Sequence, residues 1–70
     1  MHIEGKKLTD EHVGKLVTYI PRYARGHEHA KEWDVGTIKR WNEYYVFVVF
    51  DGYNAQGCMP STLRWGDLIN

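Results

Sequence analysis

The chain has almost none of the covalent support that small proteins often use. It contains one cysteine, Cys58, among 70 residues, so no disulfide can form within the chain. The N-terminal segment MHIEGKKLTDEH lacks the apolar core of a secretory signal. No apolar run approaches the ~18 residues of a membrane-spanning helix. We therefore expect a protein of the cytoplasm that does not contact membranes.

Net charge is also lacking. Nine basic and nine acidic side chains give a formal net charge of zero with histidine neutral. Proteins that bind nucleic acid without sequence preference normally carry an excess of Lys and Arg, because their affinity comes largely from neutralised phosphates. The overall composition therefore does not favour nucleic-acid binding, and support for it has to come from a local cluster of basic residues.

Aromatic residues, in contrast, are abundant, with three Trp, five Tyr and two Phe. A chain of this length buries only about 60% of the surface that its unfolded form exposes. Large rings compensate, because each one buries much area for the backbone it orders. We expect a single domain over residues 9–70, preceded by a polar lead-in at residues 1–8.

Short runs of β-branched and aromatic residues, separated by turn signals, predict five strands. The expected strands are residues 15–21, 35–41, 44–50, 58–60 and 63–65. One helical turn is expected in LTDEHVGK, where Thr9 or Asp10 can cap it and Gly14 can end it. Residues 22–34 are polar and predict a long loop. The fold class is therefore all-β, with at most one short helical turn.

The order of these segments resembles that of the SH3-like barrel, and the KOW and Tudor-type barrels are nearest. VTYIP matches the first strand, GTIKRW and YYVFVVF match the central hairpin, and STLRW matches the turn into the fifth strand. The order VGKLVTY…GTIKRW…VFVVFDG…LRW is also similar to that of short uncharacterised phage and prophage proteins. The resemblance spans residues 9–66. It implies a five-stranded SH3-like barrel with a long first loop, a non-enzymatic role, and the host cytoplasm if the chain is phage-encoded.

The segment YYVFVVF has apolar or aromatic residues on both faces. Side chains alternate along a strand, and only one face of a barrel strand can point inward. We assign Val46, Val48 and Phe50 to the interior, which leaves Tyr45, Phe47 and Val49 facing outward. Either the protein's own loop or C-terminal segment covers the outward face, or this face is an exposed surface for a partner.

The first functional hypothesis is a non-catalytic module that binds another protein, including a second copy of the chain as a homodimer. Peptide-binding SH3 domains use an aromatic groove beside an acidic loop, whereas VTYIPRYARGHEH is locally basic. An acidic partner surface therefore suits this loop. The expected contact residues are the outward face and the aromatic side chains near the loop, namely Tyr45, Phe47, Val49, Tyr23, Trp33 and Trp41.

The second hypothesis is nucleic-acid binding through residues 22–41, where basic and aromatic side chains are interleaved. In single-stranded nucleic-acid binding, the basic groups contact phosphates and the rings stack on bases. This hypothesis requires the basic residues to lie on one surface. The expected phosphate contacts are Arg22, Arg25, Lys31, Lys39 and Arg40.

The third hypothesis is a metal site in GHEHAKEWD. On a strand, His27 and His29 would share a face, and a nearby carboxylate would complete a three-ligand zinc site. The spacing matches no standard zinc finger, and the chain has one thiol. We therefore predict no cofactor.

Catalytic signatures are missing from the sequence. It has no glycine-rich phosphate loop and no Ser-His-Asp pattern. Cys58 lies in QGCMP, where a small buried hydrophobic residue is the expected role. We therefore expect a protein that is not an enzyme.

Overall fold

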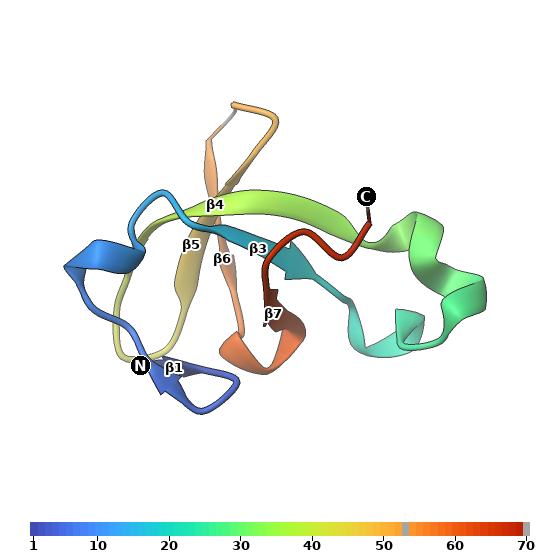
Figure 1. Cartoon of the computed structure of the whole chain (residues 1–70), viewed down its shortest axis with the longest axis horizontal. Helices are drawn as coiled ribbons and strands as arrows, with labels where there is room; N and C mark the ends of the chain where they lie inside the picture. The colour runs from blue at the N-terminus through green and yellow to red at the C-terminus, as the bar shows by residue number, and fades with distance from the viewer. Residues whose placement is uncertain (53, 70) are drawn as a thin grey trace.

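The computed structural model describes residues 1–52 and 54–69, without the side chain of His27. The described strands are β1 (His2–Ile3), β2 (Lys6–Lys7), β3 (Leu16–Tyr19), β4 (Asp34–Trp41), β5 (Val46–Phe50), β6 (Ala55–Cys58) and β7 (Leu63–Trp65). The last five form one antiparallel sheet in the order β6-β5-β4-β3-β7, and β1 pairs with β2 in a separate hairpin (Figure 1). The predicted all-β class is confirmed.

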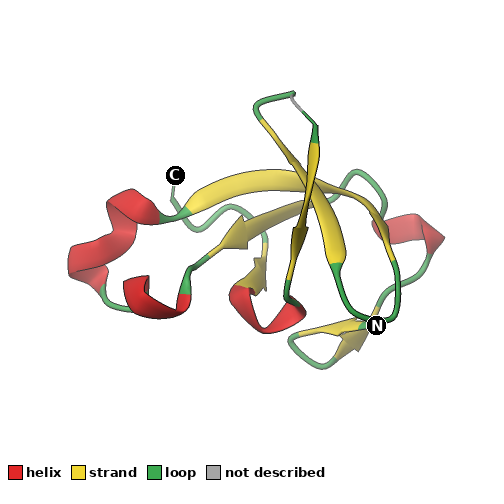
Figure 2. Cartoon of the chain, turned by 180° about the vertical axis from the view of Figure 1, so that it is seen from behind, coloured by secondary structure: helices red, strands yellow, loops and turns green. Residues whose placement is uncertain are grey.

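Helical turns are more frequent than expected. The described residues contain four 3-10 segments (Figure 2): η1 (Asp10–His12), η2 (Arg22–Ala24), η3 (His27–Glu32) and η4 (Pro60–Thr62). The expectation of at most one short helical turn is therefore wrong. None of these segments, in the part of the chain that is described, is long and apolar enough to cross a membrane.

Two of these turns occupy the segment that was expected to be a loop. A long polar segment must still pair its backbone groups, and here it does so through local bonds of the 3-10 type. The Ala24 N–H donates to the Pro21 carbonyl, and the His29 N–H donates to the Gly26 carbonyl. Residues 22–34 project from the end of the sheet where β4 begins (Figure 1).

The strand near Cys58 lies earlier in the chain than the sequence pattern predicted. The expected strand at residues 58–60 is wrong, because β6 ends at Cys58 and pairs with β5 from Ala55 onward. Pro60 instead occupies the first turn of η4, a position where its missing N–H costs nothing. The last predicted strand, residues 63–65, coincides with β7.

Residues 1–8 pack with the sheet, whereas a polar lead-in outside the domain was expected. Ile3 and Leu8 are buried in the same hydrophobic cluster as the sheet residues. The indole N–H of Trp65 donates to the Ile3 carbonyl at 2.9 Å. Only two residues of this segment, Ile3 and Leu8, are buried in the cluster. An alternation of apolar and polar residues this short does not identify a hairpin from sequence.

The core lies on the inward face of β5. Val46 and Val48 have no exposed surface and Phe50 is 8% exposed, which confirms their assignment to the interior. Gly36 on β4 lies so close to β5 that a Cβ built there would be 2.5 Å from the Val49 carbonyl oxygen. Further along β4, the pairing with β5 shifts between Ile38 and Arg40, as expected for a bulge that bends a strand.

Candidate functional site

A groove of about 410 Å³ opens between η2 and the segment that joins β6 to η4. Tyr19 from β3 and Tyr23 from η2 line it together with Cys58 and Met59, and Phe50 is the most deeply buried of its aromatic residues. This volume lies within the range of roughly 300–1,000 Å³ that is usual for ligand sites.

Short 3-10 turns form the backbone on both sides of the groove. Pro21 follows β3 and precedes η2, in which Ala24 is buried while Tyr23 is 74% exposed. On the other side, the Thr62 N–H and hydroxyl both donate to the Met59 carbonyl, at 2.9 and 2.6 Å. The Met59 side chain remains 49% exposed. The groove therefore presents two large, exposed side chains on a hydrogen-bonded backbone.

The remaining contacts connect and order the two walls. Tyr19 and Phe50 make an edge-on contact, with ring centroids 6.3 Å apart and planes at 66°, a favourable geometry for aromatic pairs. Arg25, just after η2, donates from Nη2 to the Ser61 carbonyl at 3.2 Å. This bond joins the η2 side of the groove to η4.

The thiol of Cys58 forms part of the groove. Burial raises the pKa of this thiol to about 11. A thiol with such a pKa is protonated at neutral pH, whereas a cysteine nucleophile acts as the thiolate. Cys58 therefore contributes an uncharged surface to the groove.

The outward face of β5 is covered in part by its neighbours in the sheet. The guanidinium of Arg40 lies over the Phe47 ring, 4.6 Å from its centroid. Gly57 is the residue opposite Phe47 on β6, and it leaves room for the ring. Val49 is half-buried, while Tyr45 is exposed. Phe47 thus lies between residues of its neighbouring strands, and neither the loop nor the C-terminal segment is needed for this contact.

The six predicted partner-binding residues are divided among several locations. Tyr23 lines the groove, and Trp33 donates its indole N–H to the Ala24 carbonyl, which joins η3 to η2. Trp41 packs against the core and lines a shallow recess with Arg40. Of the six, Tyr23 is thus the residue that combines high exposure with a place in the groove.

The predicted phosphate contacts do not form one cluster. Arg22 lies just beyond β3 where Tyr19 pairs with Asp34, the first residue of β4. Lys39 and Arg40 lie near the other end of this eight-residue strand, about 20 Å away at the rise of a strand. Lys31 is exposed on η3. The nucleic-acid hypothesis required all these basic residues to lie on one surface, and they do not.

The segment of the metal hypothesis is a 3-10 helix and not a strand, so its geometric premise is wrong. His29 lies 3.4 Å from Glu32 through Nδ1 and 4.0 Å from Glu28 through Nε2. The side chain of His27 lies outside the described part of the structure. Among the residues that are described, no group of three His, Cys, Asp or Glu side chains could hold a metal ion.

Sequence reasoning missed a second groove, which is lined by Lys6, His12, Lys15 and Trp65. These residues belong to separate segments and form no motif, so only the fold brings them together. The indole of Trp65 is half-buried and forms part of the groove surface.

No protein-family model, curated protein or solved structure matches the chain. A function for the chain therefore has to be inferred from the chemistry of its own grooves.

Proposed function

We propose that the chain is a non-catalytic protein-interaction module that holds an extended segment of a partner protein in the groove between η2 and η4. The main support for this proposal is that Tyr23 and Met59, both large and exposed, line one groove with the buried Phe50. Concave, mainly apolar surfaces with few polar groups are the usual form of a binding site. Tyrosine and methionine are enriched in protein interfaces.

The charge around the groove favours an acidic partner segment. Among the described residues that line the groove, Arg22 alone carries a charge, and its side chain is exposed. Charge complementarity of this kind sets the orientation and specificity of a complex more than its affinity. A partner segment with apolar residues for the groove and a carboxylate near Arg22 fits both features.

The edge of the sheet favours an extended conformation for that segment. β6 is the outer strand beside β5, and its residues Gln56 and Gly57 line the groove. An edge strand presents backbone donors and acceptors to a further strand, and many domains bind peptides in this way. An extended partner can therefore combine backbone pairing along β6 with side chains in the groove.

The fold that we propose for this module is a small SH3-like barrel. The sheet order and the bulge in β4 support it, since a bulge allows a sheet to curl. The hydrophobic cluster draws on both ends of the sheet order, with Cys58 from β6 and Leu63 from β7, and Ile3 of the N-terminal hairpin also belongs to it. A sheet whose two outer strands both contribute to one cluster supports the proposal of a barrel.

A peptide library displayed against the purified protein tests the function. We expect enrichment of peptides with apolar and acidic residues, and direct titration of an enriched peptide by calorimetry. Tyr23→Ala should weaken its binding about tenfold, as for a residue at the centre of an interface. Tyr44→Ala is the matched control, because Tyr44 is also exposed, at 68%, and does not line the groove.

The results that contradict the proposal are equally defined. Failure to enrich any peptide, or an equal loss of binding in both tyrosine variants, rejects the groove as the interaction site. Light scattering of the protein alone tests whether the partner is a second copy of the chain. A dimer that dissociates on Tyr23→Ala identifies the partner as a second copy of the chain.

A further inference from the structure

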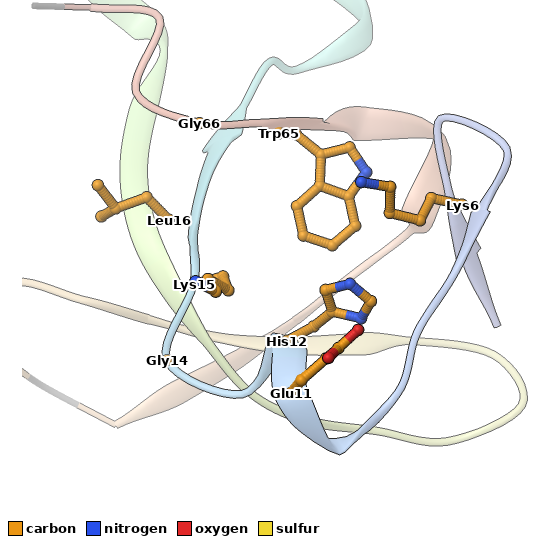
Figure 3. Close-up of a pocket in the computed structure, with 8 residues that line it drawn as sticks. All are labelled: Lys6, Glu11, His12, Gly14, Lys15, Leu16, Trp65 and Gly66. Carbon is orange, nitrogen blue, oxygen red and sulfur yellow. The ribbon is translucent and has the colours of Figure 1, made fainter.

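A second groove lies where β3 begins and β7 ends (Figure 3). It is open to solvent and has a volume of about 690 Å³, enough for a small organic molecule. β2, η1, β3 and β7 supply its walls, with Lys6, His12, Leu16 and Trp65 among the residues that line it. It shares no lining residue with the groove proposed for peptides.

The groove carries positive charge that the protein itself does not neutralise. Lys6 and Lys15 line it together with a single carboxylate, that of Glu11. In the described part of the chain, the ion pairs within 4.0 Å both involve His29, so neither lysine has a carboxylate partner. Unpaired ammonium groups beside a concave surface attract an anion.

His12 adds a hydrogen-bond donor to this groove. The Thr9 backbone N–H donates to Nδ1 of His12 at 3.0 Å. An imidazole nitrogen that accepts a hydrogen bond carries no proton, so the hydrogen of the neutral ring is on Nε2. No group among the described residues accepts from Nε2. The imidazole therefore has a free N–H donor near the two lysines.

The groove also has an aromatic wall. Trp65 is fixed by two hydrogen bonds, from its indole N–H to the Ile3 carbonyl at 2.9 Å and from its backbone N–H to the Glu4 carboxylate at 2.7 Å. Its ring contacts His12 with centroids 5.1 Å apart, and Lys6 Nζ lies 5.6 Å from the ring centroid. Figure 3 shows the two rings together on one side of β3, and the Leu16 side chain directed away from them. The ordered, half-buried indole of Trp65 is thus the apolar surface that this groove offers.

We infer that this groove binds a nucleoside monophosphate unit, either as a free nucleotide or as a residue of a single-stranded nucleic acid. A phosphate has several oxygens for the nitrogens of Lys6, His12 and Lys15, whereas a lone carboxylate would leave donors without acceptors. A base is a flat ring that can stack on the exposed part of the Trp65 indole. An inorganic anion would not use the indole of Trp65, and an apolar peptide would not use the lysines.

Titrations followed by ¹H–¹⁵N correlation spectra test this inference on the whole chain at low salt. The probes are adenosine 5′-monophosphate, adenosine, inorganic phosphate and a single-stranded hexamer of adenylate. We expect adenosine 5′-monophosphate to shift the amides of Gly14, Leu16 and Gly66 and the indole N–H of Trp65 in a saturable way. Adenosine and phosphate should each bind more weakly, since each lacks one half of the contacts.

Two pairs of lysine substitutions make the test specific. Lys6→Gln with Lys15→Gln should weaken binding of adenosine 5′-monophosphate about tenfold, as two exposed charge contacts together allow. Lys7→Gln with Lys31→Gln removes the same charge from exposed residues that do not line the groove, and it should leave the affinity unchanged. Thermal melting of both variants verifies that they are folded.

Each outcome either tests the inference or identifies the ligand as a free nucleotide or a nucleic acid. A hexamer that binds the same amides more tightly than the mononucleotide supports nucleic acid as the source, and equal affinity supports a free nucleotide. Absence of saturation, shifts confined to other surfaces, or equal losses in the two double variants overturn the inference. So does an acidic aromatic dipeptide, aspartyl-phenylalanine, that shifts these amides at lower concentration than the mononucleotide. Peptide binding in the other groove is measured separately, so failure of one proposal leaves the other standing.

Discussion

Trp65 and Ile3 are joined by a hydrogen bond of 2.9 Å although they are 62 positions apart in the sequence. The bond connects β7 to β1, and Ile3 itself is fully buried. It gives the N-terminal hairpin a structural role, because the buried side chain and the paired carbonyl both belong to Ile3. Residues 1–8 should therefore matter for stability far more than their polar composition suggests.

Truncation of the Ile3 side chain measures that role. Ile3→Ala should lower the free energy of unfolding by about 2–5 kcal/mol, because it removes apolar contacts and leaves a cavity. His2→Ala, at the exposed neighbouring position, should change it by less than about 0.5 kcal/mol. Urea unfolding followed by tryptophan fluorescence measures both. Equal stability of the two variants would show that the hairpin is not part of the cooperative unit.

The close approach of β4 to β5 predicts a strong effect at Gly36. A Cβ there would meet the Val49 carbonyl at 2.5 Å and the Val48 side chain at 2.6 Å, so Gly36→Ala should destabilise the fold by about 1–3 kcal/mol through overpacking. Gly57→Ala is the control, because its nearest atom would be a Phe47 ring carbon at 3.3 Å. Thermal unfolding of both variants measures the difference, and a harmless Gly36→Ala would contradict the tight strand contact.

Burial of the Cys58 thiol predicts a dependence of stability on alkaline pH. Its pKa is raised from 9.0 to about 11 in the folded chain, so the folded state holds its proton at pH values where the unfolded chain releases it. The stability contributed by the neutral thiol is therefore fully present below about pH 9, and it is lost as the pH rises toward 11. The urea midpoint of the protein, compared with that of Cys58→Ala from pH 8 to 10.5, isolates this effect.

Chemical labelling gives a separate measure of the same thiol. Iodoacetamide at pH 8 should alkylate the folded protein much more slowly than the urea-unfolded chain, because the thiolate is the reactive species. Equal rates in the two states would mean that Cys58 is accessible and ionises normally, and its place in the wall of the groove would have to be revised.

The contact between Arg40 and Phe47 predicts a measurable coupling. With the guanidinium 4.6 Å from the ring centroid, a cation–π interaction at an exposed site should contribute about 0.5–1 kcal/mol. A double-mutant cycle with Arg40→Gln and Phe47→Leu gives this value directly. Strictly additive effects would show that Phe47 is held by strand packing alone.

Local patterns predicted the parts of the fold that local physics decides. Alternation in YYVFVVF identified the inward side of β5, since burial on one face imposes a period of two. Pro21 was predicted to end the first strand, because it cannot donate to a ladder, and β3 ends two residues earlier, at Tyr19. The position of β6 was missed because Ala55, Gln56 and Gly57 have low strand propensity, and pairing with β5 overrides that propensity.

The candidate sites were harder to predict than the fold. Tyr23 was recognised because it lies within a basic and aromatic stretch, but its partner across the groove, Met59, comes from a distant segment. The second groove joins Lys6, His12 and Trp65 from segments that no motif connects. Such sites depend on the three-dimensional arrangement of β3 and β7, and a single sequence does not report which strands are neighbours.

The pairing of β3 with β7, and the contact of β7 with β1, have a kinetic consequence. Thr18 pairs with Arg64, and Trp65 bonds to Ile3, so these contacts close large loops of chain before any stabilisation is gained. Folding rates fall as contacting residues become more distant in sequence, and domains of this type fold in milliseconds to seconds. The hairpin of β4 and β5 is the local element that can form early, and the N-terminal hairpin can dock only when β7 is in place.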